Sequence, residues 1–105
     1  MMKINLFKIE KGKLEKWLEW GHCLMTEHQE EAVETLKEEG LIYEGFCVSE
    51  VAGNYYTLAM IEGYERPTNM ERELNQKHRE VKRDCLDKLG PVEKAYELYA
   101  EKSED

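Results

Sequence analysis

Two of the three histidines of this chain fall where a helical pattern predicts the protein interior. His28 follows the period of the apolar residues between positions 14 and 39, and His78 follows the period of those between 68 and 88. A buried imidazole must find a hydrogen-bond partner. The two histidines therefore predict either a polar network within the core or a site that binds or transforms a ligand.

A carboxylate on a predicted strand is the third candidate. Glu44 has the same strand parity as Ile42, Phe46 and Val48, so it would lie in an apolar setting if that parity faces the helices. Such a carboxylate needs a partner, which a protonated histidine or a metal ion would supply. We therefore assign His28, His78 and Glu44 to a candidate catalytic pocket.

Three interpretations of these residues stay open, with a structural polar network first and a ligand or catalytic pocket second. The third is a metal site, because two histidines and a carboxylate resemble the facial triad that holds iron or zinc. No spacing such as H-E-x-x-H is present in the chain, so we assign no metal and require no cofactor.

The elements that would position these residues follow from periodicity and turn residues. We expect strands over 3–9, 41–50, 55–61 and 92–100, with helices over 14–39 and from 68 or 69 to 88. Gly40 and Gly90-Pro91 would end the helices, and residues 51–54 would form a hairpin turn. The order predicts an α+β, ferredoxin-like βαββαβ domain over 1–100, in which two helices cover one face of a four-stranded antiparallel sheet. Residues 101–105 would form a disordered tail.

The outer face of that sheet carries the next prediction. In residues 41–48, apolar side chains occur at both parities, with Ile42 and Phe46 on one and Leu41 and Tyr43 on the other. A sheet with one solvated face normally alternates between apolar and polar residues. An apolar outer face needs a cover, so we expect a homodimer formed through the sheet faces.

Composition narrows the function classes. The chain has 105 residues and a formal net charge of -8, which argues against binding to nucleic acid or to an anionic membrane surface. It has no apolar run of about 18 residues and no secretory signal pattern, so we expect a cytoplasmic protein. The three cysteines have no C-x-x-C spacing, which indicates reduced thiols.

A set of residues between positions 4 and 88 matches the pattern of a known family: Glu27-His28, Glu30-Glu31, Thr35-Leu36, Glu44, Lys77-His78 and Cys85. In these residues the chain resembles an uncharacterised bacterial family within the dimeric α/β-barrel superfamily. The family pattern would place a further histidine where this chain has Arg72. The resemblance implies a ferredoxin-like fold and a homodimer, and it implies no activity.

Other members of that superfamily suggest what such a fold does. They include cofactor-free and haem-degrading monooxygenases, which work in a cavity between sheet and helices. The haem-degrading members resemble this chain at Asn5 and His78, but they also use a tryptophan shortly before that histidine, which this chain lacks. We therefore expect an uncharacterised small homodimer with a pocket for a small apolar or aromatic ligand. The alternatives are a monooxygenase-like enzyme and a binding module without chemistry.

Overall fold

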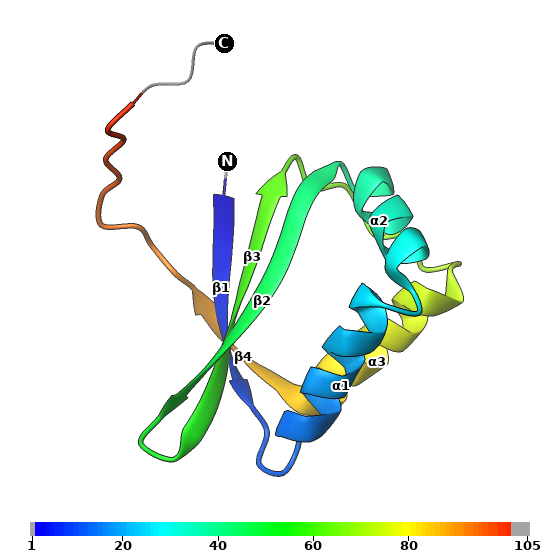
Figure 1. Ribbon diagram of the computed structural model, residues 1–105, viewed down its shortest axis with the longest axis horizontal. Coiled ribbons are helices and arrows are strands. Elements are labelled where there is room, and N and C mark those ends of the chain that lie inside the picture. Colours follow the sequence, from blue (N-terminus) through cyan, green and yellow to red (C-terminus); the bar gives the residue numbers. More distant parts are fainter. Residues whose placement is uncertain (1, 102–105) are drawn as a thin grey trace.

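The computed structural model describes residues 2–101, which form four strands and three helices. In chain order these are β1 (Met2–Ile9), α1 (Leu14–Met25), α2 (Gln29–Glu38), β2 (Leu41–Val51), β3 (Asn54–Gly63), α3 (Glu73–Cys85) and β4 (Leu86–Pro91). The strands form one antiparallel sheet in the order β2-β3-β1-β4, and the helices lie on the same side of it (Figure 1). The predicted α+β class and four-stranded antiparallel sheet are confirmed.

The hairpin between β2 and β3 forms where the sequence predicts it. Ala52 and Gly53 both have positive φ, at 51° and 82°. Two consecutive residues in this conformation give a tight turn whose twist matches that of the flanking strands. The long β2–β3 pairing that follows, from Val51 opposite Asn54 to Leu41 opposite Gly63, holds Glu44 opposite Ile61.

The single helix predicted over 14–39 is wrong, because the chain breaks between α1 and α2. The Thr26 hydroxyl donates a hydrogen bond to the His22 carbonyl oxygen at 2.8 Å, and the Cys23 carbonyl accepts from the backbone N–H groups of Thr26 and His28. Threonine side chains compete in this way for backbone groups that would otherwise continue a helix. His28 consequently stands at the N-cap of α2 rather than inside one long helix.

The last helix and strand also differ from the prediction. Helix α3 begins at Glu73 and ends at Cys85, and β4 follows at once over Leu86–Pro91. The helix predicted to run to residue 88 includes Leu86, but in the structure Leu86 pairs with Ile9 of β1 and is buried there. Pairing with β1 therefore overrides the local helical pattern. Gly90-Pro91 ends a strand instead of a helix.

The predicted strand over 92–100 is wrong as well. The Val92 N–H still donates to the Ile4 carbonyl oxygen at 2.9 Å, but no regular element follows in residues 92–101, and all of these residues are exposed. The proposed tail over 101–105 lies, except for Glu101, outside the described residues. The single domain over 1–100 stays a prediction. Within residues 2–101, no helix is both long and apolar enough to cross a membrane.

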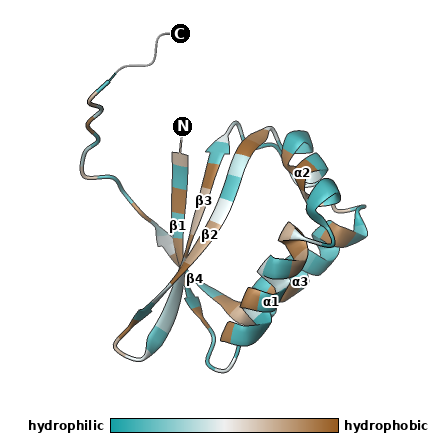
Figure 2. Ribbon diagram, viewed as in Figure 1, coloured by the Kyte–Doolittle hydropathy of each residue, from teal (hydrophilic) through white to brown (hydrophobic). Residues whose placement is uncertain are grey.

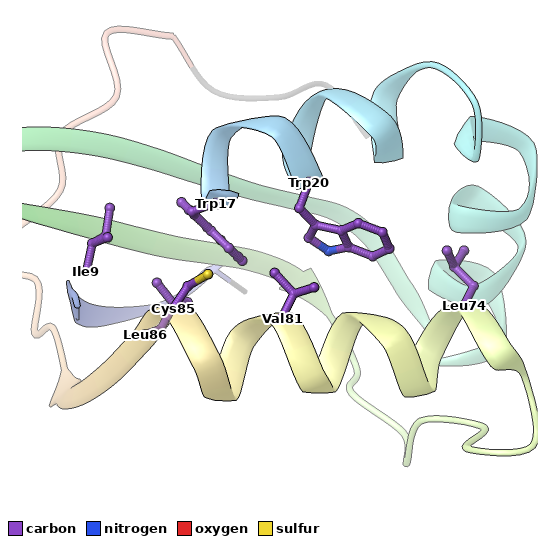
Figure 3. Packing of buried hydrophobic residues seen from close by; sticks show 7 residues of the cluster. All are labelled: Ile9, Trp17, Trp20, Leu74, Val81, Cys85 and Leu86. Carbon is purple, nitrogen blue, oxygen red and sulfur yellow. The ribbon is translucent and has the colours of Figure 1, made fainter. Parts of the chain in front are cut away.

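The core gathers where α1 and α3 cross β1 and β4. Figure 3 shows Trp17 and Trp20 of α1 directed toward α3, which presents Val81 and Cys85 to them. Trp17 and Trp20 are both buried. The rest of the cluster consists of Ile9, Leu74 and Leu86. Colouring by hydropathy shows that α1 and α3 each contain both hydrophobic and hydrophilic residues (Figure 2).

Gly40 joins α2 to β2, and a substitution at this position can show whether this connection constrains the fold. Its φ is 76°, and a Cβ atom there would collide with the Tyr64 carbonyl oxygen. Gly12 has a similar φ of 82° but open space around it, so it serves as a matched control. We expect Gly12→Ala to lower the free energy of unfolding by about 1 kcal/mol, from backbone strain alone.

Gly40→Ala should cost more than about 2 kcal/mol, since a backbone collision adds to the same strain. Urea unfolding of the two variants and the wild type measures both values. Equal losses in the two variants would contradict the close approach of Gly40 to the segment around Tyr64.

Candidate functional site

A cleft of about 1000 Å³ lies between the sheet and the helices. The sheet contributes side chains that alternate along the strands, among them Asn5 and Phe7 of β1 and Ala59 and Ile61 of β3. Helices α1, α2 and α3 contribute the opposite wall. The residues that line this wall include Trp17, Trp20, Leu24, Leu36, His78 and Lys82. The cleft therefore combines an aromatic lining with a few polar groups, as small-molecule sites do.

His78 is held in one orientation by Trp20. The Trp20 indole Nε1–H donates a hydrogen bond to His78 Nδ1 at 2.8 Å, and the two rings lie 6.1 Å apart between centroids. Burial lowers the pKa of His78 from 6.5 to about 4, and the positive charge of Lys82 acts in the same direction. The imidazole is therefore neutral at physiological pH. Because Nδ1 accepts a hydrogen bond, the proton is assigned to Nε2.

The Nε2–H group of His78 is free to meet a ligand. It makes no hydrogen bond to the described residues. Among residues 2–101, Thr57 Oγ1 is the only fully buried side-chain nitrogen or oxygen that has no partner. His78 Nε2 must therefore be accessible to a molecule the size of water. The geometry thus offers a fixed, neutral hydrogen-bond donor on a residue that lines the cleft.

His28 is the second histidine near the Trp20 indole. Its ring centroid is 6.2 Å from that of Trp20, with the two planes 45° apart. His28 does not line the cleft. Both histidine rings therefore neighbour Trp20, but of the two only His78 lines the cleft.

Glu44 lies on the face of the sheet that the helices cover, and it lines the cleft. Burial raises the pKa of Glu44, Lys82 partly opposes this effect, and Glu65 adds to it. The strand parity of Glu44 therefore faces the helices, which was the condition for this carboxylate to lie in an apolar setting. Its partner is not a histidine, since the residue that lowers its pKa is Lys82.

Comparison with known protein families gives one match. The model of a family of unknown function, DUF6176, matches residues 2–103. The chain belongs to this family. No curated protein and no solved structure matches it. Membership of a family without an assigned function, as the resemblance implied, is confirmed, and the family name adds no chemistry to the site.

Sequence reasoning missed one residue of this site, Lys82, which stands among other charged residues of α3 and by its type alone is typical of a solvated helix face. In the structure the Lys82 ammonium lies 5.9 Å from the centre of the Phe46 ring, between the helix and the sheet. Lys82 is four residues after His78, so both lie on one helix face, and this spacing could have identified it.

In the part of the chain that the structure describes, the side chains form no metal-binding site. No group of three or more histidine, cysteine, aspartate or glutamate side chains lies close enough there to hold a metal ion. The facial arrangement suggested by His28, His78 and Glu44 is therefore not formed within residues 2–101.

Arg72, at the position where the resemblance would place a histidine, serves the fold instead. Its guanidinium contacts both oxygens of Glu38, at 3.1 and 2.8 Å, and Glu31 at 3.1 Å. These carboxylates hold the pKa of Arg72 above its ordinary value. The fork geometry of arginine suits such a bidentate pair. Arg72 thus ties α2 to the start of α3.

The lowered pKa of His78 predicts a pH dependence of stability. The folded state holds His78 neutral, whereas the unfolded chain takes up a proton near pH 6.5. The contribution of His78 to the free energy of unfolding is therefore complete above pH 6.5 and is lost as pH falls toward 4. His78→Asn retains an acceptor for Trp20 and does not titrate. The stability gap between wild type and this variant should shrink by about 2 kcal/mol from pH 8 to pH 5.

Glu44 contributes to the pH dependence of the free energy of unfolding with the opposite sign, so its contribution must be eliminated from this comparison. Its raised pKa favours the fold when the carboxyl is protonated, and this contribution disappears as pH rises through the raised value. The comparison is therefore made with Glu44→Gln in both proteins, by urea unfolding at the two pH values. A gap that does not change with pH would show that His78 is not buried in its neutral form.

Proposed function

We propose that this protein binds a small molecule in the cleft between its sheet and its helices, with His78 as the residue that contacts the ligand. The observation that carries the proposal is the hydrogen bond from Trp20 to His78, which fixes a neutral imidazole and leaves its Nε2–H group accessible. A site with a rigid polar group in an aromatic setting is prepared for binding before the ligand arrives.

Glu44 and His28 have different roles in this proposal. Glu44 lines the cleft and has a raised pKa, so it can exchange a proton with a ligand closer to neutral pH than an exposed glutamate can. His28 packs against Trp20 outside the cleft, so it acts as a positioning residue through the indole. We keep His78 and Glu44 as the candidate pair for any chemistry.

We infer a ferredoxin-like fold and a homodimer formed through the sheet faces. The strand order β2-β3-β1-β4, with the helices on one side, supports the first inference. The second is supported by the face opposite the helices, where β1 places Ile4 and Leu6 beside Met60 and Leu58 of β3. Within residues 2–101, no helix covers these apolar pairs (Figure 1), and Leu58 is 37% exposed. A second copy of the chain would remove them from water.

Residues beyond β4 also support a partner copy. Tyr96, Leu98 and Tyr99 are 74%, 87% and 77% exposed, which is unusual for three large side chains so close together. The chain around them leaves the sheet edge and extends away from the helices (Figure 1). A second copy would offer these side chains an apolar surface.

The three cysteines, all unpaired, further support a reducing compartment such as the cytoplasm.

A monooxygenase-like enzyme is the second candidate, because Asn5 and His78 line the same cleft. Of its two forms, the cofactor-free one is better supported. An axial histidine must present an unprotonated ring nitrogen to haem iron, but His78 Nδ1 already accepts from Trp20 and Nε2 carries the proton. The donor set therefore does not fit haem, and titration with haem should give no Soret band that depends on His78.

The binding proposal is tested with the neutral aromatic 1-naphthalenemethanol. The chain has two tryptophans, so nitrogen-15 spectra report Trp20 and Trp17 as separate indole N–H signals. We expect saturable shifts of both, and we expect His78→Ala to weaken binding about tenfold, from the loss of one hydrogen bond. His22→Ala is the matched control, because His22 is exposed on α1. Absence of any shift of the Trp20 signal, both with this probe and with charged probes of the same ring system, would overturn the proposal.

The dimer is tested by placing a charge on each side of the molecule. Leu58 is 37% exposed on the outer sheet face, and Met25 is 67% exposed at the end of α1. In sedimentation velocity the wild type and Met25→Glu should have twice the chain mass, whereas Leu58→Glu should be monomeric because it buries an unpaired carboxylate in the interface. A monomeric wild type, or a dimeric Leu58→Glu, would contradict a dimer through the sheets.

A further inference from the structure

The lining of the cleft differs in charge from the protein as a whole. The chain carries a formal net charge of -8. The cleft, however, is lined by more basic than acidic residues: Lys3, Arg79, Lys82, Arg83 and Lys88 against Glu39, Glu44 and Glu65. A concave site with apolar walls concentrates the field of the charges that line it. The cleft is therefore a basic region in an acidic protein.

Lys82 is the basic group best placed to meet a ligand. Lys3 is neutralised by Glu65 at 2.9 Å. The other four basic residues form no ion pair within residues 2–101, and of these only Lys82 is half-buried, whereas Arg79, Arg83 and Lys88 are exposed. Its ammonium lies over the ring of Phe46 at the boundary between α3 and the sheet. Burial raises the pKa values of Glu39 and Glu44, so these two carboxylates are weaker competitors for Lys82 than exposed ones.

The side chains near Lys82 indicate which other chemical features the ligand should have. His78 precedes Lys82 by four residues on α3, so the two side chains are neighbours on one helix face. One is a fixed N–H donor and the other a cation, which together suit the two oxygens of one carboxylate. Phe7, Trp17 and Phe46 supply flat apolar surface in the same cleft. A flat ring attached to a carboxylate satisfies both requirements.

We propose that the ligand of the cleft is a small aromatic carboxylate, whose anionic group pairs with Lys82 and accepts from His78 Nε2–H while its ring packs among Phe7, Trp17 and Phe46. This inference rests on the proposed function, since it names the ligand class of the same site. It requires no chemical step, and it holds both for an enzyme and for a binding module.

The test compares three probes of one ring system: the anion 1-naphthoate, the neutral 1-naphthalenemethanol and the cation 1-naphthylmethylammonium. Dissociation constants are measured by calorimetry at pH 7, and the Trp20 indole signal confirms the site. We expect 1-naphthoate to bind the wild type at least about tenfold more tightly than the neutral probe, as a charge-assisted hydrogen bond implies. The cation should bind most weakly.

Variants of Lys82 separate charge from packing. Lys82→Met should remove the preference for 1-naphthoate over the neutral probe and leave the affinity for the neutral probe unchanged, whereas Lys82→Arg should retain the preference. Lys77→Met, which removes an exposed charge of the same helix outside the cleft, should change neither. Thermal melts of each variant confirm that it folds.

The outcomes distinguish the two proposals. Equal or tighter binding of the neutral or cationic probe, with the Trp20 signal shifted, would overturn the aromatic carboxylate and leave the binding cleft in place. A preference for 1-naphthoate that survives Lys82→Met would also overturn it. If none of the three probes shifts the Trp20 signal, the binding cleft itself is wrong, and the ligand class fails with it.

Discussion

The hydrogen bond between Trp20 and His78 is the contact on which the candidate site depends. It joins α1 to α3 inside the protein, where a missing partner would leave both an indole N–H and an imidazole nitrogen unsatisfied. It also decides which nitrogen of His78 carries the proton, and so which chemical group a ligand meets. One bond thus fixes the packing of two helices, the tautomer of the histidine and the character of the cleft.

The cleft follows from the uneven distribution of the core. The buried cluster gathers around Trp17, Val81 and Cys85, where α1 and α3 cross β1 and β4 (Figure 3). The break after α1 turns α2 toward β2, and Arg72 holds α2 through Glu31 and Glu38. The helices are therefore fixed at both ends of the sheet, while the space between them and the middle of the sheet is only partly filled.

The sequence predicted part of this arrangement, and the errors have physical causes. Apolar periodicity identified β1, the hairpin and the body of α3, because these patterns depend on neighbours along the chain. It failed at Thr26, where a side-chain hydroxyl ends α1 against an otherwise continuous stripe, and at Leu86, where pairing with β1 replaced the next helical turn. At Thr26 the competing contacts are local hydrogen bonds of a side chain and the backbone, whereas at Leu86 a helical preference of a few tenths of a kcal/mol per residue gives way to pairing with a distant strand.

The sequence by itself determined that His78 and Glu44 would be exceptional, since a histidine on an apolar stripe and a carboxylate among apolar strand residues must each find a partner. It also determined the α+β class, through the alternation of strand and helix periods. Only the tertiary structure decided the partners. Trp20, and not Glu44, is the hydrogen-bond partner of His78, and His28 does not line the cleft, whereas Glu44 and Lys82 do. The physical reason is that periodicity gives the direction of a side chain from its own element, whereas the identity of its partner depends on how two elements pack.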